Sequence, residues 1–200
     1  MHSDTTETNP VDPAGSADDQ GALREEPLIT VPIGAHHRIN DFSCDLSPRV
    51  AGFFAKEAQI LVPNYCRLFI AADPNDPSHI WGFYTLSAAI LLKTNLTGSD
   101  EKRVSKNYMG YPAPMVRIGF MGRDRSAPKK FGGTLIVDAA RRVHRNRDIA
   151  AWGIVLESEG GPENAKLWAW YDDKGFKPCR GSHPHSMYAP LTKFIPELQG

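Results

Sequence analysis

The segment of residues 116–143 constrains the fold most strongly, because it predicts a strand, a loop and a helix in direct succession. The strand is expected over residues 115–123, and Pro128 and the Gly132–Gly133 pair end it. From Thr134 onward, apolar residues recur at helical spacing: Leu135, Ile136, Ala139, Ala140 and Val143. A chain built around such a unit is expected to fold as an α/β domain.

The loop of this unit has the features of an anion site. Glycines let a backbone come close to a ligand, and the start of a helix leaves N–H groups without partners. Lys129 and Lys130 add positive charge beside the helix dipole. The loop therefore predicts a phosphate site, although many helices begin after Gly-Gly with no ligand.

Residues 1–27 differ in composition from the rest of the chain. They contain few large apolar residues, one basic residue (Arg24) and seven acidic ones: Asp4, Glu7, Asp12, Asp18, Asp19, Glu25 and Glu26. Such a segment cannot bury enough surface to offset the entropy of ordering, so we expect an acidic, disordered tail. Residues 28–200 are expected to form one domain, with 22 basic against 16 acidic residues.

Basic residues concentrate in the central unit. Nine lie between Arg117 and Arg147, among them Arg117, Arg125, Arg141, Arg142 and Arg145, and only Asp124 and Asp138 oppose them. Such a patch suits the phosphates of a nucleotide cofactor or of a nucleic acid. The alternative is a solvated helix face. The acidic tail is a candidate competitor with nucleic acid for this surface.

Nothing at the N-terminus has the order of a signal peptide, and no apolar run approaches a membrane span, so a cytoplasmic protein is expected. The cysteines Cys44, Cys66 and Cys179 are widely separated, which favours reduced thiols. The histidines lack accompanying ligands at metal spacing, so no metal site is predicted.

The remaining elements follow from local patterns. A first strand or arm is expected at residues 28–33, a helix after Ser47-Pro48, and a hairpin of residues 66–72 and 80–87. A surface connection containing a short helix is expected at residues 95–107. A strand over residues 150–157, a helix over residues 163–173 closed by Gly175, and a final pair of strands at residues 176–179 and 186–191 complete a mixed sheet with helices on both faces.

Three stretches resemble the GNAT acyl-CoA N-acyltransferases: residues 81–87, residues 116–143 and residues 164–176. In the last, Asn164 is followed seven residues later by Tyr171 and then by Gly175-Phe176. Within that superfamily the chain is most similar to the toxins of toxin–antitoxin pairs, through the Gly-Phe-Tyr-Thr-Leu strand of residues 82–86 and Pro112-Ala113-Pro114. These toxins acetylate the amino group of aminoacyl-tRNA and stop translation. The implied fold is a mostly antiparallel sheet flanked by helices.

The resemblance also implies a site for acetyl-CoA. The backbone of Met121, Gly122 and Arg123 would pair with the pantetheine arm, and Asn164 would bind that arm from the second helix. The amides of the loop and helix start would hold the pyrophosphate: Lys129, Lys130, Phe131, Gly132, Gly133 and Thr134. Tyr171 would act as general acid toward the leaving thiolate.

The loop departs from the family pattern at two positions. Ala127 stands at the first position and Lys130 replaces the inner glycine, while Gly132 fits. A lysine adopts the left-handed conformation less readily than a glycine, so a displaced loop or weaker cofactor binding is one expectation. A direct contact between Lys130 and phosphate is the other.

Three functions remain open. The first is a toxin that acetylates aminoacyl-tRNA, with the basic patch holding tRNA phosphates; a ribbon-helix-helix antitoxin and a homodimer are then implied by the resemblance. The second is an acetyltransferase for a small-molecule or protein amine. The third is a relative that binds acyl-CoA or RNA without catalysis. Glu157 and Glu159 are candidates for the general base, and a water chain is an alternative.

Overall fold

A computed structural model describes residues 27–44, 47–57, 64–146, 148–181 and 184–195, so all but the last residue of the predicted tail lies outside the described residues. The strands are β1 (Val31–Pro32), β2 (Arg67–Asp73), β3 (Asp76–Leu91), β4 (Ala113–Arg123), β5 (Gly153–Glu157), β6 (Lys177–Pro178) and β7 (Ser186–Pro190). They form one seven-stranded sheet in the order β1-β2-β3-β4-β5-β7-β6. Among the strands of the described residues, only the β4–β5 pairing is parallel, which confirms the predicted mixed, mostly antiparallel fold.

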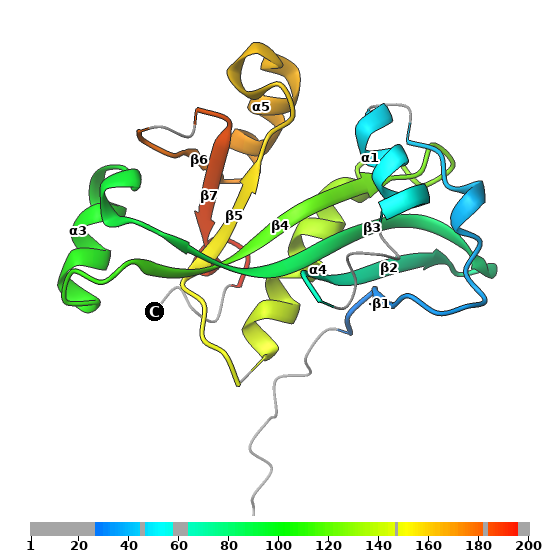
Figure 1. Cartoon of the computed structure of the whole chain (residues 1–200), viewed down its shortest axis with the longest axis horizontal. Helices are drawn as coiled ribbons and strands as arrows, with labels where there is room; N and C mark the ends of the chain where they lie inside the picture. The colour runs from blue at the N-terminus through cyan, green and yellow to red at the C-terminus, as the bar shows by residue number, and fades with distance from the viewer. Residues whose placement is uncertain (1–26, 45–46, 58–63, 147, 182–183, 196–200) are drawn as a thin grey trace, which may run out of the picture.

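Helices cover both faces of the sheet (Figure 1). They are α1 (Pro48–Gly52), which continues into the π-helical turn Phe53–Glu57, α3 (Gly98–Asn107), α4 (Phe131–Arg145) and α5 (Ala165–Asp173). Short 3-10 turns are Ile39–Asp41, Lys93–Asn95, Gly161–Glu163 and Leu191–Lys193. The main core packs α4 and α5 against one face, and two smaller cores lie on the other face beneath α1 and beneath α3.

Local sequence signals explain where several elements begin and end. The Ser47 side chain accepts a hydrogen bond from the Val50 N–H and caps α1, as predicted from Ser47-Pro48. Gly175 has a φ of 89°, and the N–H of Phe176 donates to the Tyr171 carbonyl, which closes α5 as predicted. Phe53 and Phe54, in the turn that follows α1, are buried.

The start of α4 differs from the prediction. The helix begins at Phe131, three residues before Thr134, so Gly132 and Gly133 lie in its first turn and do not break the chain. The residue that turns the chain is Lys130, whose φ of 71° and ψ of 0° are left-handed. The strand β3 also runs to Leu91, four residues beyond its predicted end, because it pairs with β4 along its whole outer half.

Candidate active site

The sheet opens between its two parallel strands. β4 pairs with β5 from Met115 to Ile118, and from there the two strands diverge, as Figure 1 shows. On its β5 side, β4 therefore has no partner strand over residues 119–123 within the part of the chain that the structure describes. Met121, Gly122 and Arg123, which the sequence predicts to bind pantetheine, all lie on this open edge. An extended ligand can pair with such an edge as an added strand would.

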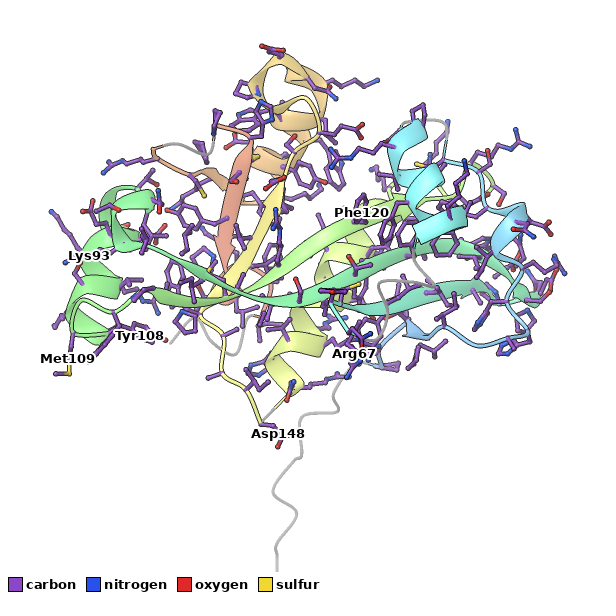
Figure 2. The ribbon with its side chains drawn as sticks, in the orientation of Figure 1. Arg67, Lys93, Tyr108, Met109, Phe120 and Asp148 are labelled. Carbon is purple, nitrogen blue, oxygen red and sulfur yellow. The ribbon has the colours of Figure 1, made fainter. Side chains whose placement is uncertain are left out.

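A bulge in β4 lies at the point where the strands separate. Between the Tyr84–Met121 and Leu86–Ile118 pairs the register shifts, so that Gly119 and Phe120 stand opposite Thr85 alone. The Thr85 hydroxyl accepts the Phe120 N–H at 2.9 Å. The Phe120 ring, labelled in Figure 2, stacks on Phe53 with centroids 3.6 Å apart and ties the bulge to the turn after α1.

The loop between β4 and α4 is organised by Asp124, which is 2% exposed. Its Oδ2 accepts the Ser43 N–H at 2.6 Å, and its Oδ1 accepts the Ser126 N–H and hydroxyl at 2.8 and 2.6 Å. The Arg123 guanidinium closes the same loop by donating to the Ala127 carbonyl at 2.8 Å. Sequence reasoning used Asp124 only as a charge, although its position directly after a strand and before a turn is a signal for this kind of cap.

The loop presents backbone N–H groups at the start of α4. Within the described residues, the N–H groups of Lys129, Lys130 and Gly132 make no hydrogen bond. Two of the N–H groups predicted to hold the pyrophosphate are already hydrogen-bonded: the Phe131 N–H donates to the Pro128 carbonyl, and the Gly133 N–H donates to the Lys130 carbonyl. Thr134 lies one turn into the helix. The open N–H groups and the dipole of α4 together form a site for an anion.

Helix α5 packs beside this anion site. A Cβ atom on Gly132 would lie 3.4 Å from the Trp170 ring, and one on Gly133 would lie 3.6 Å from the Lys174 side chain. The Lys174 ammonium lies 6.0 Å from the centre of the Trp170 ring. Glycine at position 132 therefore allows close packing of α4 on α5, and Lys174 adds a cation that the sequence analysis did not single out.

Tyr171 lies on the buried side of α5, 8% exposed, with its ring edge-on to Trp170 and Phe176. Its hydroxyl makes no hydrogen bond to any residue that the structure describes. Burial, with a smaller contribution from the Glu159 carboxylate, raises the pKa of Tyr171 to about 12. The phenol is therefore protonated at neutral pH and available as a donor.

Asn164 caps α5. Its side-chain oxygen accepts the Leu167 N–H at 3.4 Å, and its Nδ2 donates to the Glu159 carbonyl at 3.2 Å. These contacts fix the turn between β5 and α5, a role that the sequence did not predict. Its contact with a cofactor stays a prediction.

The two candidate bases have different surroundings. Glu157 forms an ion pair with Arg117, a residue predicted to bind nucleic acid, and both side chains are about half exposed. Glu159 forms no ion pair within the described residues, and its charge helps to raise the pKa of Tyr171. The neighbouring Ser158 is 1% exposed and its hydroxyl has no hydrogen-bond partner among those residues.

The predicted basic patch separates into two groups. Arg142 is engaged internally: its Nη2 donates to the Thr30 carbonyl at 2.6 Å, its Nε donates to the Tyr84 hydroxyl at 3.0 Å, and its guanidinium lies 4.0 Å from the Phe69 ring centre. Its main contacts are therefore structural, and its contact with nucleic acid stays a prediction. Arg125 is exposed on the loop, and Arg141 and Arg145 are partly exposed on α4.

Comparison with known proteins supports the architecture. No protein-family model matches the sequence. Among solved structures, a tyrosine-to-phenylalanine mutant of KacT is similar with a TM-score of 0.69 at 19% identity, covering 82% of this chain and 95% of that one. AtaT complexed with acetyl-methionyl-tRNAfMet is similar with a TM-score of 0.68 at 20% identity, covering 82% and 94%.

A third structure is an AtaT mutant toxin bound to the C-terminus of the antitoxin AtaR and to acetyl-CoA, with a TM-score of 0.65 at 18% identity, covering 86% of this chain and 98% of that one. None of the described helices is long and apolar enough to cross a membrane. At this level of identity the likeness establishes the fold. The chain therefore has the fold of AtaT and KacT.

Proposed function

We propose that this protein transfers the acetyl group of acetyl-CoA to the α-amino group of an aminoacyl-tRNA in the cytoplasm and thereby blocks translation. The observation that carries the proposal is the combination of the open β4 edge with the N–H groups of the adjoining loop that have no partner among the described residues. An extended arm ending in a pyrophosphate matches both parts. The likeness to AtaT, solved with acetyl-methionyl-tRNAfMet, supports the choice of acceptor.

The residues present fit the donor. Residues 121–123 offer backbone groups to a pantetheine arm, and Lys129, Lys130 and Gly132 offer N–H groups to a pyrophosphate. Phe131, Gly133 and Thr134 shape the same helix turn rather than donate freely. Acetyl-CoA, when bound, supplies the acetyl group, and the protein binds it, orients it and protects it from water.

The role of Tyr171 follows from its pKa of about 12. A thiol has a pKa of about 8.5, so complete transfer of the phenolic proton to the leaving sulfur is unfavourable. A hydrogen bond from the phenol to the developing thiolate is favourable, because the donor is neutral, buried and without another partner among the described residues. Tyr171 thus stabilises the leaving group while the C–S bond breaks.

The acceptor needs little assistance. An aminoacyl α-amine has a pKa near 8, so a substantial fraction is already neutral at physiological pH. Glu159 is better placed than Glu157 to accept the proton that the amine loses, because Glu157 is held by Arg117. Arg125, Arg141 and Arg145 supply positive charge for tRNA phosphates. As part of the same proposal, a ribbon-helix-helix antitoxin binds this protein, and the protein forms a homodimer.

The decisive experiment measures acetyl transfer from radiolabelled acetyl-CoA to total charged tRNA, beside deacylated tRNA and a panel of small amines. Label on charged tRNA alone is the expected result. Label on small amines would show that the acceptor is a small amine. Acetyl-CoA binding without transfer to any amine would show that the protein binds acetyl-CoA without catalysis.

The Tyr171→Phe variant tests the chemistry within the same assay. Loss of the hydrogen bond to sulfur should lower kcat about 100-fold or more, with little change in acetyl-CoA affinity. The matched control is Tyr111→Phe, since Tyr111 is 70% exposed and lies outside the site. Equal kcat values for the wild type and Tyr171→Phe would remove Tyr171 from the mechanism.

A further inference from the structure

The first described segment of the chain is fixed to helix α4 by a buried cluster. The Ile29 N–H donates to Oδ1 of Asp138 at 2.6 Å, and the Thr30 hydroxyl donates to Oδ2 at 2.5 Å. Arg142 binds the Thr30 carbonyl from the next turn of the helix. Thr30 and Asp138 are each 3% exposed. The point at which residues 1–26 leave the domain is therefore held directly on α4.

The same side of α4 is basic. Asp138, Arg141, Arg142 and Arg145 are spaced as i, i+3, i+4 and i+7, so their side chains share one side of the helix. Asp138 and Arg142 both bind the arm, and Arg141 and Arg145 place two further positive charges on the same side, toward the C-terminal end of the helix; these two residues are here named the α4 arginine stripe. Arg141 and Arg145 are partly exposed.

The segment that precedes the arm carries the opposite charge. Residues 1–26 contain seven acidic residues and one basic residue, and two of the acidic ones, Glu25 and Glu26, stand directly before the first described residue. Extended, these 26 residues could reach about 85 Å, whereas α4 is about 22 Å long. Attachment beside the α4 arginine stripe gives the segment a local concentration in the millimolar range.

We propose that the acidic segment of residues 1–26 binds the α4 arginine stripe and competes there with nucleic-acid phosphate. The docking half of this inference stands on the arm, the arginine spacing and the charge of the segment. The competition half rests on the proposed function, because the tRNA of that function is the source of the phosphates that would bind this face.

Docking is tested without RNA or activity. The protein is the full chain in which the seven acidic residues of the segment are replaced by their amides, and the probe is a fluorescent peptide of residues 1–26 with the native sequence. The peptide should bind in low salt, and binding should weaken at least tenfold in the Arg141→Gln/Arg145→Gln protein. A matched control, Lys102→Gln/Lys106→Gln on α3, should leave binding unchanged. No binding, or equal loss in both double variants, would overturn the inference.

Competition is tested with deacylated total tRNA. The amide-tail protein should bind tRNA about tenfold more tightly than the wild type at low salt, and the difference should disappear at high salt. Equal tRNA affinity of the two proteins would overturn the competition. Failure of both proteins to bind tRNA, together with peptide binding, would refute the nucleic-acid part of the proposed function and leave docking intact.

Discussion

Two buried carboxylates hold the unit around α4, and they do so in different ways. Asp124 lies before the helix and accepts donors from Ser43 and Ser126, all within or beside the loop. Asp138 lies inside the helix and accepts donors from the distant Ile29, Thr30 and Tyr84. The first shapes a loop, and the second joins the N-terminal arm, the sheet and the helix.

The two surroundings also differ in what they leave free. Around Asp138 the donors and acceptors are paired with one another, and Arg142 supplies the compensating charge. Beside Asp124 the N–H groups of Lys129, Lys130 and Gly132 have no partner among the described residues. Paired groups contribute to stability, and unpaired groups are available to a ligand. We therefore expect substitutions at Asp138 to change stability and substitutions at Asp124 to change binding.

The largest effect is expected from Asp138→Asn. The amide removes the charge that opposes Arg142 and places a donor where three donors converge, so the free energy of unfolding should fall by about 3–5 kcal/mol. Urea unfolding measures it. The control is Asp148→Asn, an exposed aspartate just beyond α4 in Figure 2, which should change stability by less than about 0.5 kcal/mol.

At a temperature where Asp138→Asn is still folded, its acetyl-CoA affinity should stay within about twofold of the wild type, because no group of the loop is altered. A large loss of affinity without a loss of stability would reverse the roles that the two carboxylates have been given.

Asp124→Asn should show the opposite pattern. An amide cannot accept the Ser43 and Ser126 donors with the same strength, so the loop should loosen and acetyl-CoA affinity should fall about tenfold. The accompanying loss in free energy of unfolding should be smaller, about 1–2 kcal/mol. Calorimetric titration with acetyl-CoA and urea unfolding of the same preparation measure the two quantities.

The pH dependence of stability sharpens this second prediction. Burial acts to raise the pKa of the Asp124 carboxyl, but hydrogen bonds from Ser126 and Ser43 outweigh it, so the folded pKa lies below the ordinary value of an aspartate. The stabilisation is therefore complete above the unfolded pKa and is lost as the pH falls through the folded one. The stability difference between wild type and Asp124→Asn should be constant from pH 7 to pH 5 and shrink below pH 4. A constant difference down to pH 3 would contradict this assignment.

Much of the fold was predictable because its signals are local. The hairpin turn before β3, Ser47 at the start of α1, and Gly175 at the end of α5 are each defined by a few neighbouring residues. The central strand-loop-helix unit was predicted from periodicity alone. The resemblance then supplied the mostly antiparallel pairing of the sheet, which local patterns cannot give.

The parts that were missed depend on distant contacts. Asp138 and Arg142 appear in the sequence as a lone acid and one member of a basic run, and nothing near them indicates that residues 29 and 30 will lie against α4. The early start of α4 was missed because Gly132 and Gly133 are poor helix formers, and the packing of Trp170 and Lys174 against them outweighs that propensity. Local reasoning therefore found the loop, but it did not show that the Phe131 and Gly133 N–H groups donate within it or that Arg142 holds the N-terminal arm.

The smallest effect separates the backbone of the loop from its charge. Lys130 adopts a φ of 71°, where a residue with a Cβ atom is less stable than glycine by about 1 kcal/mol. Lys130→Gly should therefore raise the free energy of unfolding by about that amount. Such a rise would show that the backbone of Lys130 is strained in the wild type. If the ammonium contacts the pyrophosphate, the same variant should bind acetyl-CoA a few-fold more weakly, and the difference should vanish at high salt.

Lys129→Gly is the matched control, because Lys129 carries the same charge without a positive φ, and it should lose stability. Unchanged or tighter acetyl-CoA binding by Lys130→Gly would show that the Lys130 ammonium does not contact the pyrophosphate. The backbone N–H groups at the start of α4 would then bind it without this side chain, whereas the cluster around Asp138 depends on side chains.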